Sequence, residues 1–349
     1  MNVESDWLGK PYYSLNAYFR KVYGEKIYKI AVDAGLTCPN RDGTLDNRGC
    51  IFCSAGGSGD FAVDMCEQGK LSVAEQIGQG LSRFNKSVGN RFVIYFQAYT
   101  NTYGKIDYLR KIWTEALSHS EVVGISIATR PDCLGDEVLL LLRELKEKYC
   151  QTEPYGDNGD EYGRAGTCGG KFIWVELGLQ TIHEKTAEYI RRHYSLKVYE
   201  KAVVNLSNLN IPYITHIILG LPGETKEEML DTVSYVSAGV MSGDDSAGDG
   251  GKVIKPFGIK LQLLHILEGT DLAKEYKKGV FETLELNEYI DIVIDSLRRI
   301  DKSIVIHRVT GDGPKSILVS PKWSGNKKLV LNTLHKKMAE LGAFQGDRV

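Results

Sequence analysis

The sequence predicts an α/β fold: a partial (β/α)6 TIM-like barrel of parallel strands, followed by a mixed C-terminal extension. Short β-branched or aromatic runs alternate six times with longer segments of helical period. These runs are apolar on both faces, as expected of parallel strands that are covered by helices. An open doubly wound sheet fits the same pattern and is the alternative.

The six units can be placed along the chain from these patterns. The strand candidates are 26–35, 91–99, 122–129, 171–180, 212–220 and 258–267. The helix candidates are 72–88, 105–119, 135–149, 183–192, 197–209 and 225–238. Ser72 with Glu75, and Thr225 with Glu228, have the spacing of capping boxes, which supports the start of two of these helices.

The domain organisation follows from these elements. The predicted barrel spans 26–285, after a lead-in at 1–25 and before a C-terminal extension at 286–349 that packs on the barrel. Two stretches rich in Gly and acidic residues, 153–170 and 242–252, are predicted to be surface insertions. Each leads from a helix into a strand, which places it opposite the face where barrel enzymes carry their active sites.

Composition limits the classes of function. The 349 residues carry 43 basic and 45 acidic side chains, so any contact with nucleic acid needs a local patch. No apolar run reaches the roughly 18 residues of a membrane span, and no secretory leader is recognisable. We therefore expect a cytoplasmic protein without membrane contact. Seven cysteines, odd in number and clustered near the front, favour metal or redox chemistry over a disulfide framework.

The segment "CPNRDGTLDNRGCIFC" at 38–53 holds three cysteines in the loop after the first predicted strand, where a barrel carries its chemistry. Closed zinc sites usually have four ligands. A four-iron cluster held by three thiolates leaves one iron open to a cofactor or substrate. Zinc completed by Cys66 is the alternative. The scattered positions of Cys133, Cys150 and Cys168 do not suggest a second cluster.

Several motifs together resemble one known family. "DAGLTCPNRDGT…GCIFCS", "FQAYTNTY", "TRPDC", "VELGLQT", "ILGLPGE" and "HRVTGD" occur in the order expected of the YhcC/YtqA-type radical S-adenosylmethionine (SAM) proteins, over roughly residues 10 to 335. This group is similar in its core to the radical SAM domain of the Elongator catalytic subunit and to oxygen-independent coproporphyrinogen oxidase. The eleven-residue gap between the first two cysteines departs from the commoner C-x3-C-x2-C pattern and agrees with this subgroup.

The resemblance implies a cofactor pair. Cys38, Cys50 and Cys53 would hold a [4Fe-4S] cluster whose open iron binds the amino and carboxylate groups of SAM. One electron, from a donor such as flavodoxin or ferredoxin, then cleaves SAM to methionine and a 5′-deoxyadenosyl radical, which removes a hydrogen atom from the substrate. The protein's part is to position the cofactors and to exclude water.

The resemblance also implies residues that bind SAM. Phe52 matches an aromatic position near the adenine, and Arg192 matches an arginine aimed at the carboxylate. A core aromatic and a solvated helix end are the ordinary interpretations of these two residues. The other expected SAM-binding residues are Thr100, Asn101, Thr102, Gln180, His216, Gly220 and His265.

Three further residues are expected at the substrate: Glu176, Arg130 and His307. Period two places Glu176 on the same face of its strand as Gln180, toward the barrel interior. A buried carboxylate is costly unless it is paired, so Glu176 is expected to meet a ligand ammonium, an arginine or a protonated base. A structural pair between Arg130 and Glu176 is the alternative.

The likeness to Elongator implies a tRNA substrate, with the side chain on C5 of the wobble uridine as the reacting group. The tail at 322–337 contributes five lysines, a histidine and a tryptophan, enough for local phosphate contact. It is equally typical of a solvated amphipathic helix. A radical SAM enzyme with a small-molecule substrate and a non-catalytic zinc or iron–sulfur module remain the alternative functions.

Overall fold

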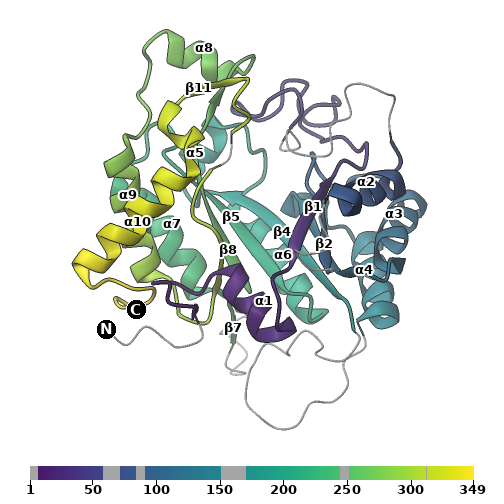
Figure 1. Ribbon diagram of the computed structural model, residues 1–349. Helices are drawn as coiled ribbons and strands as arrows, with labels where there is room; N and C mark the ends of the chain where they lie inside the picture. Colours follow the sequence, from purple (N-terminus) through teal and green to yellow (C-terminus); the bar gives the residue numbers. More distant parts are fainter. Residues whose placement is uncertain (1–6, 58–70, 84–90, 151–169, 244–250, 312) are drawn as a thin grey trace.

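A curled sheet of seven parallel strands forms the centre of the molecule (Figure 1). The computed structural model describes residues 7–57, 71–83, 91–150, 170–243, 251–311 and 313–349. The strand order is β1-β2-β3-β4-β5-β8-β10, and the strands are β1 (Tyr28–Val32), β2 (Phe92–Phe96), β3 (Val122–Thr129), β4 (Phe172–Gln180), β5 (Tyr213–Leu219), β8 (Gly258–Leu263) and β10 (Val305–Arg308). The predicted partial barrel is confirmed.

Helices cover the outside of this sheet (Figure 1). Those that follow strands are α2 (Val73–Arg83), α3 (Ile106–Ser118), α4 (Asp136–Tyr149), α5 (Glu184–Tyr189), α6 (Leu196–Asn208), α7 (Lys226–Ala238) and α9 (Leu286–Arg299). Both capping boxes are present. The side chain of Thr225 accepts from the amide of Glu228 at the start of α7, and Ser72 and Glu75 bond reciprocally before α2.

The main hydrophobic core lies between the sheet and these helices. It contains Ile94 of β2 and Ile127 of β3, together with Trp113 of α3 and Leu141 of α4, and all four side chains are fully buried. Alternate residues of each strand therefore point outward into an apolar layer. The inner positions do not contribute to this core and can therefore carry polar or charged side chains.

An aromatic cluster fills the barrel at the N-terminal ends of its strands. Phe172 and Trp174 of β4 stack with ring centroids 4.0 Å apart, and Phe257 lies 4.8 Å from Trp174. Phe19 of helix α1 (Leu15–Tyr23) stacks on Trp174 from below, at 5.8 Å and 15°. We call these four aromatic residues the barrel floor. They close one end of the barrel interior with apolar surface.

The chain around α1 also narrows the gap between the two sheet edges. Ser14 forms a parallel bridge with Ile306 of β10, and the amide of Ile306 donates to the carbonyl of Tyr13 at 2.8 Å. From there α1 leads to β1 at the other edge. The N-terminal segment thus connects the first and last strands at their N-terminal ends.

The structure adds elements that the sequence patterns did not predict. Strand β10 is too short for a periodic pattern and is held by its pairing with β8. The predicted strand 258–267 divides into β8 and β9 (Ile266–Leu267), and β9 pairs with β11 (Leu318–Ser320). Strands β6 (Val240–Ser242) and β7 (Lys252–Ile254) pair at the ends of the predicted insertion 242–252, whereas 153–169 lies outside the described residues.

The remaining elements lie near the two ends of the barrel. They are the short helices η3 (Pro131–Cys133), α8 (Asp271–Lys277) and η5 (Lys322–Gly325), and the C-terminal helix α10 (Lys327–Leu341), which packs on α9. Across the described ranges, no helix has the length and apolar character needed to cross a membrane.

Two neighbouring leucines of α4 test this arrangement. Leu141 is fully buried against the sheet, and Leu140 is 47% exposed. Leu141→Ala should lower the free energy of unfolding by about 2–5 kcal/mol, through lost burial and a cavity. Leu140→Ala should change it by less than about 0.5 kcal/mol. Chemical denaturation followed by circular dichroism measures both, and equal losses would contradict the packing described.

Candidate functional site

One loop after β1 carries the three clustered cysteines. The amide of Arg41 donates to the carbonyl of Cys38 at 2.8 Å, and the amide of Cys53 donates to that of Cys50 at 3.0 Å. Gly49 has φ 76°, and a Cβ there would lie 2.9 Å from Nε of Arg41, so this turn favours glycine. The Arg41 guanidinium donates to the Cys53 carbonyl at 3.0 Å. The loop thereby joins both ends of the cysteine motif.

The three thiols share an electropositive environment. Cys38 and Cys50 are each within electrostatic range of both Cys53 and Arg130. The hydrogen bond with Cys53 lowers the pKa of Cys50 to about 7 despite burial, and Arg130 and the side-chain amide of Asn40, 3.4 Å from Sγ, act in the same direction. The same contact raises the pKa of Cys53 well above its usual value. Cys50 is therefore partly ionised to its thiolate at neutral pH.

The donor set fits an iron–sulfur cluster. Thiolates are soft ligands of the kind that hold such clusters. Within the described ranges, no three His, Cys, Asp or Glu side chains are placed to hold a single metal ion. A four-iron cluster distributes its ligands over separate irons, so its thiols need not converge on one point. Cys66, the fourth ligand of the zinc alternative, and Cys168 lie outside the described residues.

Arg130 lies beside this loop and pairs with Asp132. Its Nη2 is 2.6 Å from a carboxylate oxygen of Asp132, and its guanidinium lies 5.0 Å from the ring centre of Tyr194. The alternative pair between Arg130 and Glu176 is wrong. Glu176 lies in register with Ala128, so Arg130 is two residues further toward the loops than a partner of Glu176 would be.

Gln180 ends β4 next to the same tyrosine. Its backbone has φ 65°, and its side chain lies 3.2 Å from the hydroxyl of Tyr194. That hydroxyl also donates to the carbonyl of Gly178. Because the charge of Cys50 acts on Tyr194, Gln180 and the cysteine loop belong to one region.

The polar segment after β2 is buried between this loop and β3. Asn101 donates to the carbonyls of Phe96 and Ala128 at 3.0 Å each, and its Oδ1 is buried without a hydrogen-bond partner in the described part of the chain. The hydroxyl of Thr102 lies 2.6 Å from that of Thr129. Thr100 is 1% exposed. Such burial makes all three expected residues parts of the framework around the loop.

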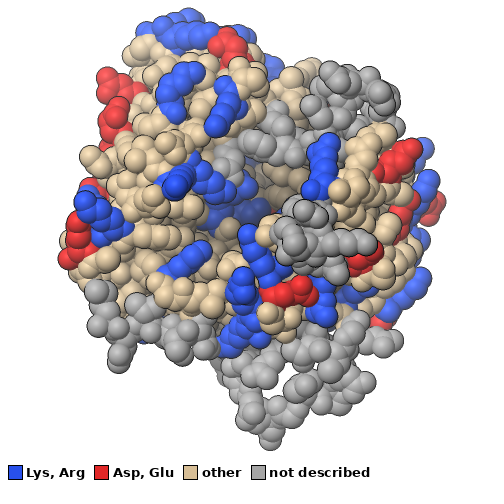
Figure 2. Space-filling view, viewed as in Figure 1, with Lys and Arg blue, Asp and Glu red and all other residues tan. Residues whose placement is uncertain are grey.

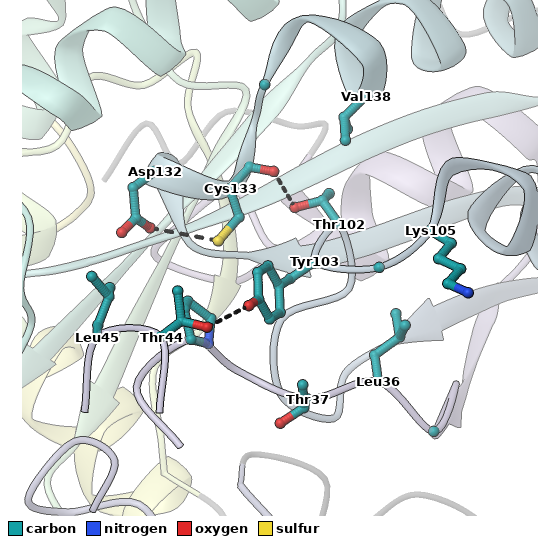
Figure 3. Close-up of a pocket in the computed structure, with 14 residues that line it drawn as sticks. Leu36, Thr37, Thr44, Leu45, Thr102, Tyr103, Lys105, Asp132, Cys133 and Val138 are labelled. Carbon is teal, nitrogen blue, oxygen red and sulfur yellow. Dashed lines mark hydrogen bonds between the residues drawn. The ribbon is translucent and has the colours of Figure 1, made fainter. Parts of the chain in front are cut away.

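A pocket of about 790 Å³ opens beside the cysteine loop (Figure 3). Pro39 of the loop, Thr102 after β2 and Cys133 after β3 contribute to its wall. Thr44 and Tyr103 hydrogen bond to each other at 2.9 Å within the lining. This volume lies in the range of small-molecule sites.

Arg192 is buried, although its position at the end of a helix suggested solvent. Its guanidinium donates to the carbonyls of Thr181 at 2.6 Å, Leu179 at 3.1 Å and Tyr194 at 2.9 Å, and it pairs with Glu184 at 3.3 Å. The solvated interpretation is wrong because these carbonyls require a donor. Arg192 holds the chain between β4 and α6 in place.

Three other expected residues lie on the side of β5 and β8. Phe52 is partly buried and packs against an apolar cluster that contains Ile218 of β5 and Leu264 after β8. Gly220 follows β5 with φ 89°. The ring of His265 lies 3.0 Å from the hydroxyl of Ser324. Phe52 and its neighbour Ile51 belong to the cysteine loop, so this apolar cluster joins the loop to the half of the sheet that contains β5 and β8.

Glu176 lies inside the barrel and is completely buried. One carboxylate oxygen accepts from Lys29 of β1 at 3.1 Å and from Ser126 of β3 at 2.6 Å. The other accepts from His216 of β5 at 2.7 Å and from Lys260 of β8. The expectation that the carboxylate must be paired is confirmed, and its partners are two lysines, a histidine and a serine.

The protonation of this group follows from burial and charge. Burial disfavours the carboxylate of Glu176, but Lys260 and Lys29 hold its pKa well below the usual value. Burial lowers the pKa of His216 to about 4, so its ring is neutral. Nε2 of the ring donates to Glu176, and Nδ1 lies 3.1 Å from the side-chain amide of Gln262. Burial and the charge of Lys29 lower the pKa of Lys260 to about 7, against the attraction of Glu176.

Sequence reasoning missed the two lysines. Each is a charged residue inside an otherwise apolar strand, at an inner position of period two, and this pattern was visible in "KIYKIAV" and "GIKLQLL". His307 lies against the barrel floor, within electrostatic range of Lys29 and Lys260. Its ring meets Trp174 and Phe257 edge-on at 5.5 and 5.6 Å, and both ring nitrogens are buried without a partner in the described residues.

Comparison with known proteins assigns the family. The Radical SAM superfamily model matches residues 158–236, and the Radical_SAM C-terminal domain model matches 256–340. The protein YtqA of Bacillus subtilis is 38% identical over 338 residues, which cover 97% of this chain and 92% of YtqA. The chain belongs to the radical SAM superfamily. As a radical SAM protein of the same family as YtqA, it has a [4Fe-4S] cluster and SAM as its cofactors.

Two further similarities are more distant. A tRNA uridine(34) acetyltransferase of Methanocaldococcus jannaschii is 26% identical over 166 residues, which cover 48% of this radical SAM chain and 28% of that protein. The solved structure of Elp3 from Methanocaldococcus infernus, with an N-terminal deletion, has a TM-score of 0.59 at 18% identity. The match covers 92% of this chain and 64% of the Elp3 chain, and it shows a shared fold.

The lowered pKa of Lys260 predicts how the free energy of unfolding depends on pH. The folded state releases the proton of Lys260 near pH 7, whereas the unfolded chain keeps it to about 10.5. The unfolded state therefore binds more protons in this window, and stability should rise with pH by up to about 1.4 kcal/mol per unit. Burial is the main cause of this shift, and the charges that act on it are those of Glu176, Lys29 and Arg308.

Urea unfolding between pH 7 and 10 measures this slope. Lys260→Met should flatten it, because Met does not titrate. Lys255→Met, which removes a surface lysine paired with Asp301 at 2.6 Å, should leave the slope as it is. A slope that survives in Lys260→Met would show that other groups produce it.

Proposed function

We propose that this radical SAM enzyme modifies the side chain on C5 of the wobble uridine of tRNA. The similarity to a tRNA uridine(34) acetyltransferase supports this substrate, although it covers only part of either chain. The fold shared with an archaeal Elp3 is consistent with it. The similarity to this acetyltransferase is the observation that carries the proposal.

Cys38, Cys50 and Cys53 are the proposed ligands of the cluster. When bound, the reduced cluster and SAM supply a 5′-deoxyadenosyl radical, which takes a hydrogen atom from the substrate. The chain's own residues prepare this site. Arg41 fixes the loop through the Cys53 carbonyl, and Asn40 donates both to Cys50 Sγ and to the carbonyl of Arg191 at 2.8 Å.

The remaining site residues have positioning and enclosing roles in this proposal. Arg192 fixes the backbone that leads away from β4, so that Tyr194 lies against Gln180 and Arg130. Phe52 of the cysteine loop packs on the apolar cluster beside β5 and β8. The barrel floor keeps water away from the N-terminal end of the interior, which protects a reactive radical from side reactions.

The charge distribution supports an anionic substrate. Figure 2 shows Lys and Arg side chains in and around a hollow in the middle of the face that Figure 1 presents. Exposed lysines also lie on the C-terminal helix, at Lys327, Lys328 and Lys336. Trp323 does not add a stacking surface there, because its indole donates to the carbonyl of Leu284 at 3.1 Å and packs on the core. Flavodoxin or ferredoxin is the proposed electron donor.

The thiols give the first test of the proposed site. Cys38→Ala, Cys50→Ala and Cys53→Ala should each reduce bound iron and sulfide to background in anaerobically reconstituted protein and abolish formation of 5′-deoxyadenosine. Cys150→Ala should retain both, because Cys150 lies after α4 at the far end of the barrel. If Cys66→Ala loses its metal as readily as Cys50→Ala, or if stoichiometric zinc is found, the three-ligand assignment is wrong.

The substrate is tested separately in cells. Mass spectrometry of tRNA nucleosides should show loss of a modified wobble uridine, or accumulation of its precursor, in a strain that lacks the gene. Complementation with the natural sequence should restore it, and Cys50→Ala should not. An unchanged nucleoside profile, together with SAM cleavage by the purified protein, would instead indicate a small-molecule substrate.

A further inference from the structure

The ionic group inside the barrel has more cations than its carboxylate balances. Lys29 and Lys260 both pair with Glu176, and His216 is neutral. With both lysines protonated, the group carries one positive charge more than Glu176 balances. Excess positive charge in a desolvated place is unfavourable unless an anion meets it.

The two lysines also have N–H groups that make no hydrogen bond to the described residues. An ammonium group has three N–H donors. Among the described residues, Lys260 donates to Glu176 and to the hydroxyl of Tyr95 at 3.0 Å, and Lys29 donates to Glu176. Two N–H groups of Lys29, and one of Lys260 when it is protonated, therefore remain for a ligand. The carboxylate itself accepts from four groups and has little capacity for another donor.

The group can be reached from outside. The side chain of Lys29 is 21% exposed, whereas those of Lys260 and Glu176 are 5% and 0% exposed. Figure 2 shows basic side chains within the central hollow on the open side of the sheet. On the side of the cysteine loop, the next inner position on β3 carries a small residue, Ala128, whereas the side chain of Gln180 lies over Gly178 on β4. A ligand group can approach Lys29 from that direction.

The distance to the thiols suits a substrate that spans both places. Glu176 and Gln180 are four residues apart on β4, which is about 13 Å in an extended strand. Gln180 lies in the region of the cysteine loop, and Glu176 carries the two lysines. A substrate with an acidic substituent can therefore place that substituent at the lysines while its reacting carbon lies nearer the cofactors.

We propose that Lys29 and Lys260 form an anion subsite that binds a carboxylate or phosphate group of the substrate inside the barrel. Lys29 is the accessible donor, and Lys260 is the buried donor that Glu176 and Tyr95 hold in place. This inference rests on the proposed function, since it describes the substrate site of that enzyme. It adds the chemical class of group that the substrate presents.

Anion binding to the cluster-loaded protein tests the subsite. The titration uses sodium sulfate and sodium acetate, with SAM already bound so that its own carboxylate is in place. Sodium chloride at equal ionic strength is the reference. Isothermal titration calorimetry and the melting temperature should both show saturable binding of at least one of the two anions. A preference for sulfate indicates a phosphate group on the substrate, and a preference for acetate indicates a carboxylate.

Variants assign the binding to the lysines. Lys29→Met should weaken the binding at least tenfold, whereas Lys29→Arg, which keeps the charge and the donors, should restore it. Lys26→Met is the matched control, because Lys26 precedes the same strand but lies exposed over the ring of Tyr28 at 4.3 Å. Far-ultraviolet circular dichroism confirms that each variant folds, and Lys29→Met should keep its iron.

Two results would overturn the subsite. One is wild-type protein that responds to sulfate and acetate no more than to chloride. The other is Lys29→Met that binds them as the wild type does. Neither result bears on the nucleoside profile of the deletion strain, so the subsite and the tRNA substrate can fail independently. A normal nucleoside profile with saturable, Lys29-dependent anion binding would leave the subsite standing and reject tRNA.

Discussion

One buried carboxylate connects most of the barrel. Glu176 of β4 accepts hydrogen bonds from β1, β3, β5 and β8, so five of the seven strands meet at two oxygen atoms. The desolvation cost of such a group is recovered only when its donors are held in good geometry. The curvature of the sheet provides that geometry, because strands far apart in the sheet face one another across its interior. The carboxylate and the curled shape therefore depend on each other.

Above and below this carboxylate the interior changes character in layers. The barrel floor is aromatic, the middle layer is ionic, and the cysteine loop carries thiols beside Arg130. Such an order is possible because every strand alternates between an outer residue that supports the core and an inner residue that does not. The outer layer supplies the hydrophobic stabilisation, and the inner layer can hold charges at positions set by strand register.

Features set by residues close together in the sequence were predicted, whereas features set by contacts between distant residues were not. Strand β3 was predicted with its observed ends, and α7 was predicted from Thr225 and Glu228, because strand composition and capping are local properties. Strand β10 was not predicted, since its four residues become a strand only through pairing with β8. Arg192 was taken for a solvated residue because the carbonyls that bury it belong to β4 and its following turn, which sequence spacing does not reveal. The pairing of Glu176 was predicted, but its partners come from strands 40 to 147 positions away.

The barrel floor limits where ligands can enter and leave the interior. Phe19, Phe172, Trp174 and Phe257 block the N-terminal end, and the segment around Ser14 and α1 joins the sheet edges there. Ligands therefore reach the interior either from the end that carries the cysteine loop or from the hollow on the open side of the sheet (Figure 2). A ligand that covers both openings closes the interior to solvent and to smaller molecules. Small reactants must then bind before such a ligand docks, which sets an order of binding without a moving segment of the protein.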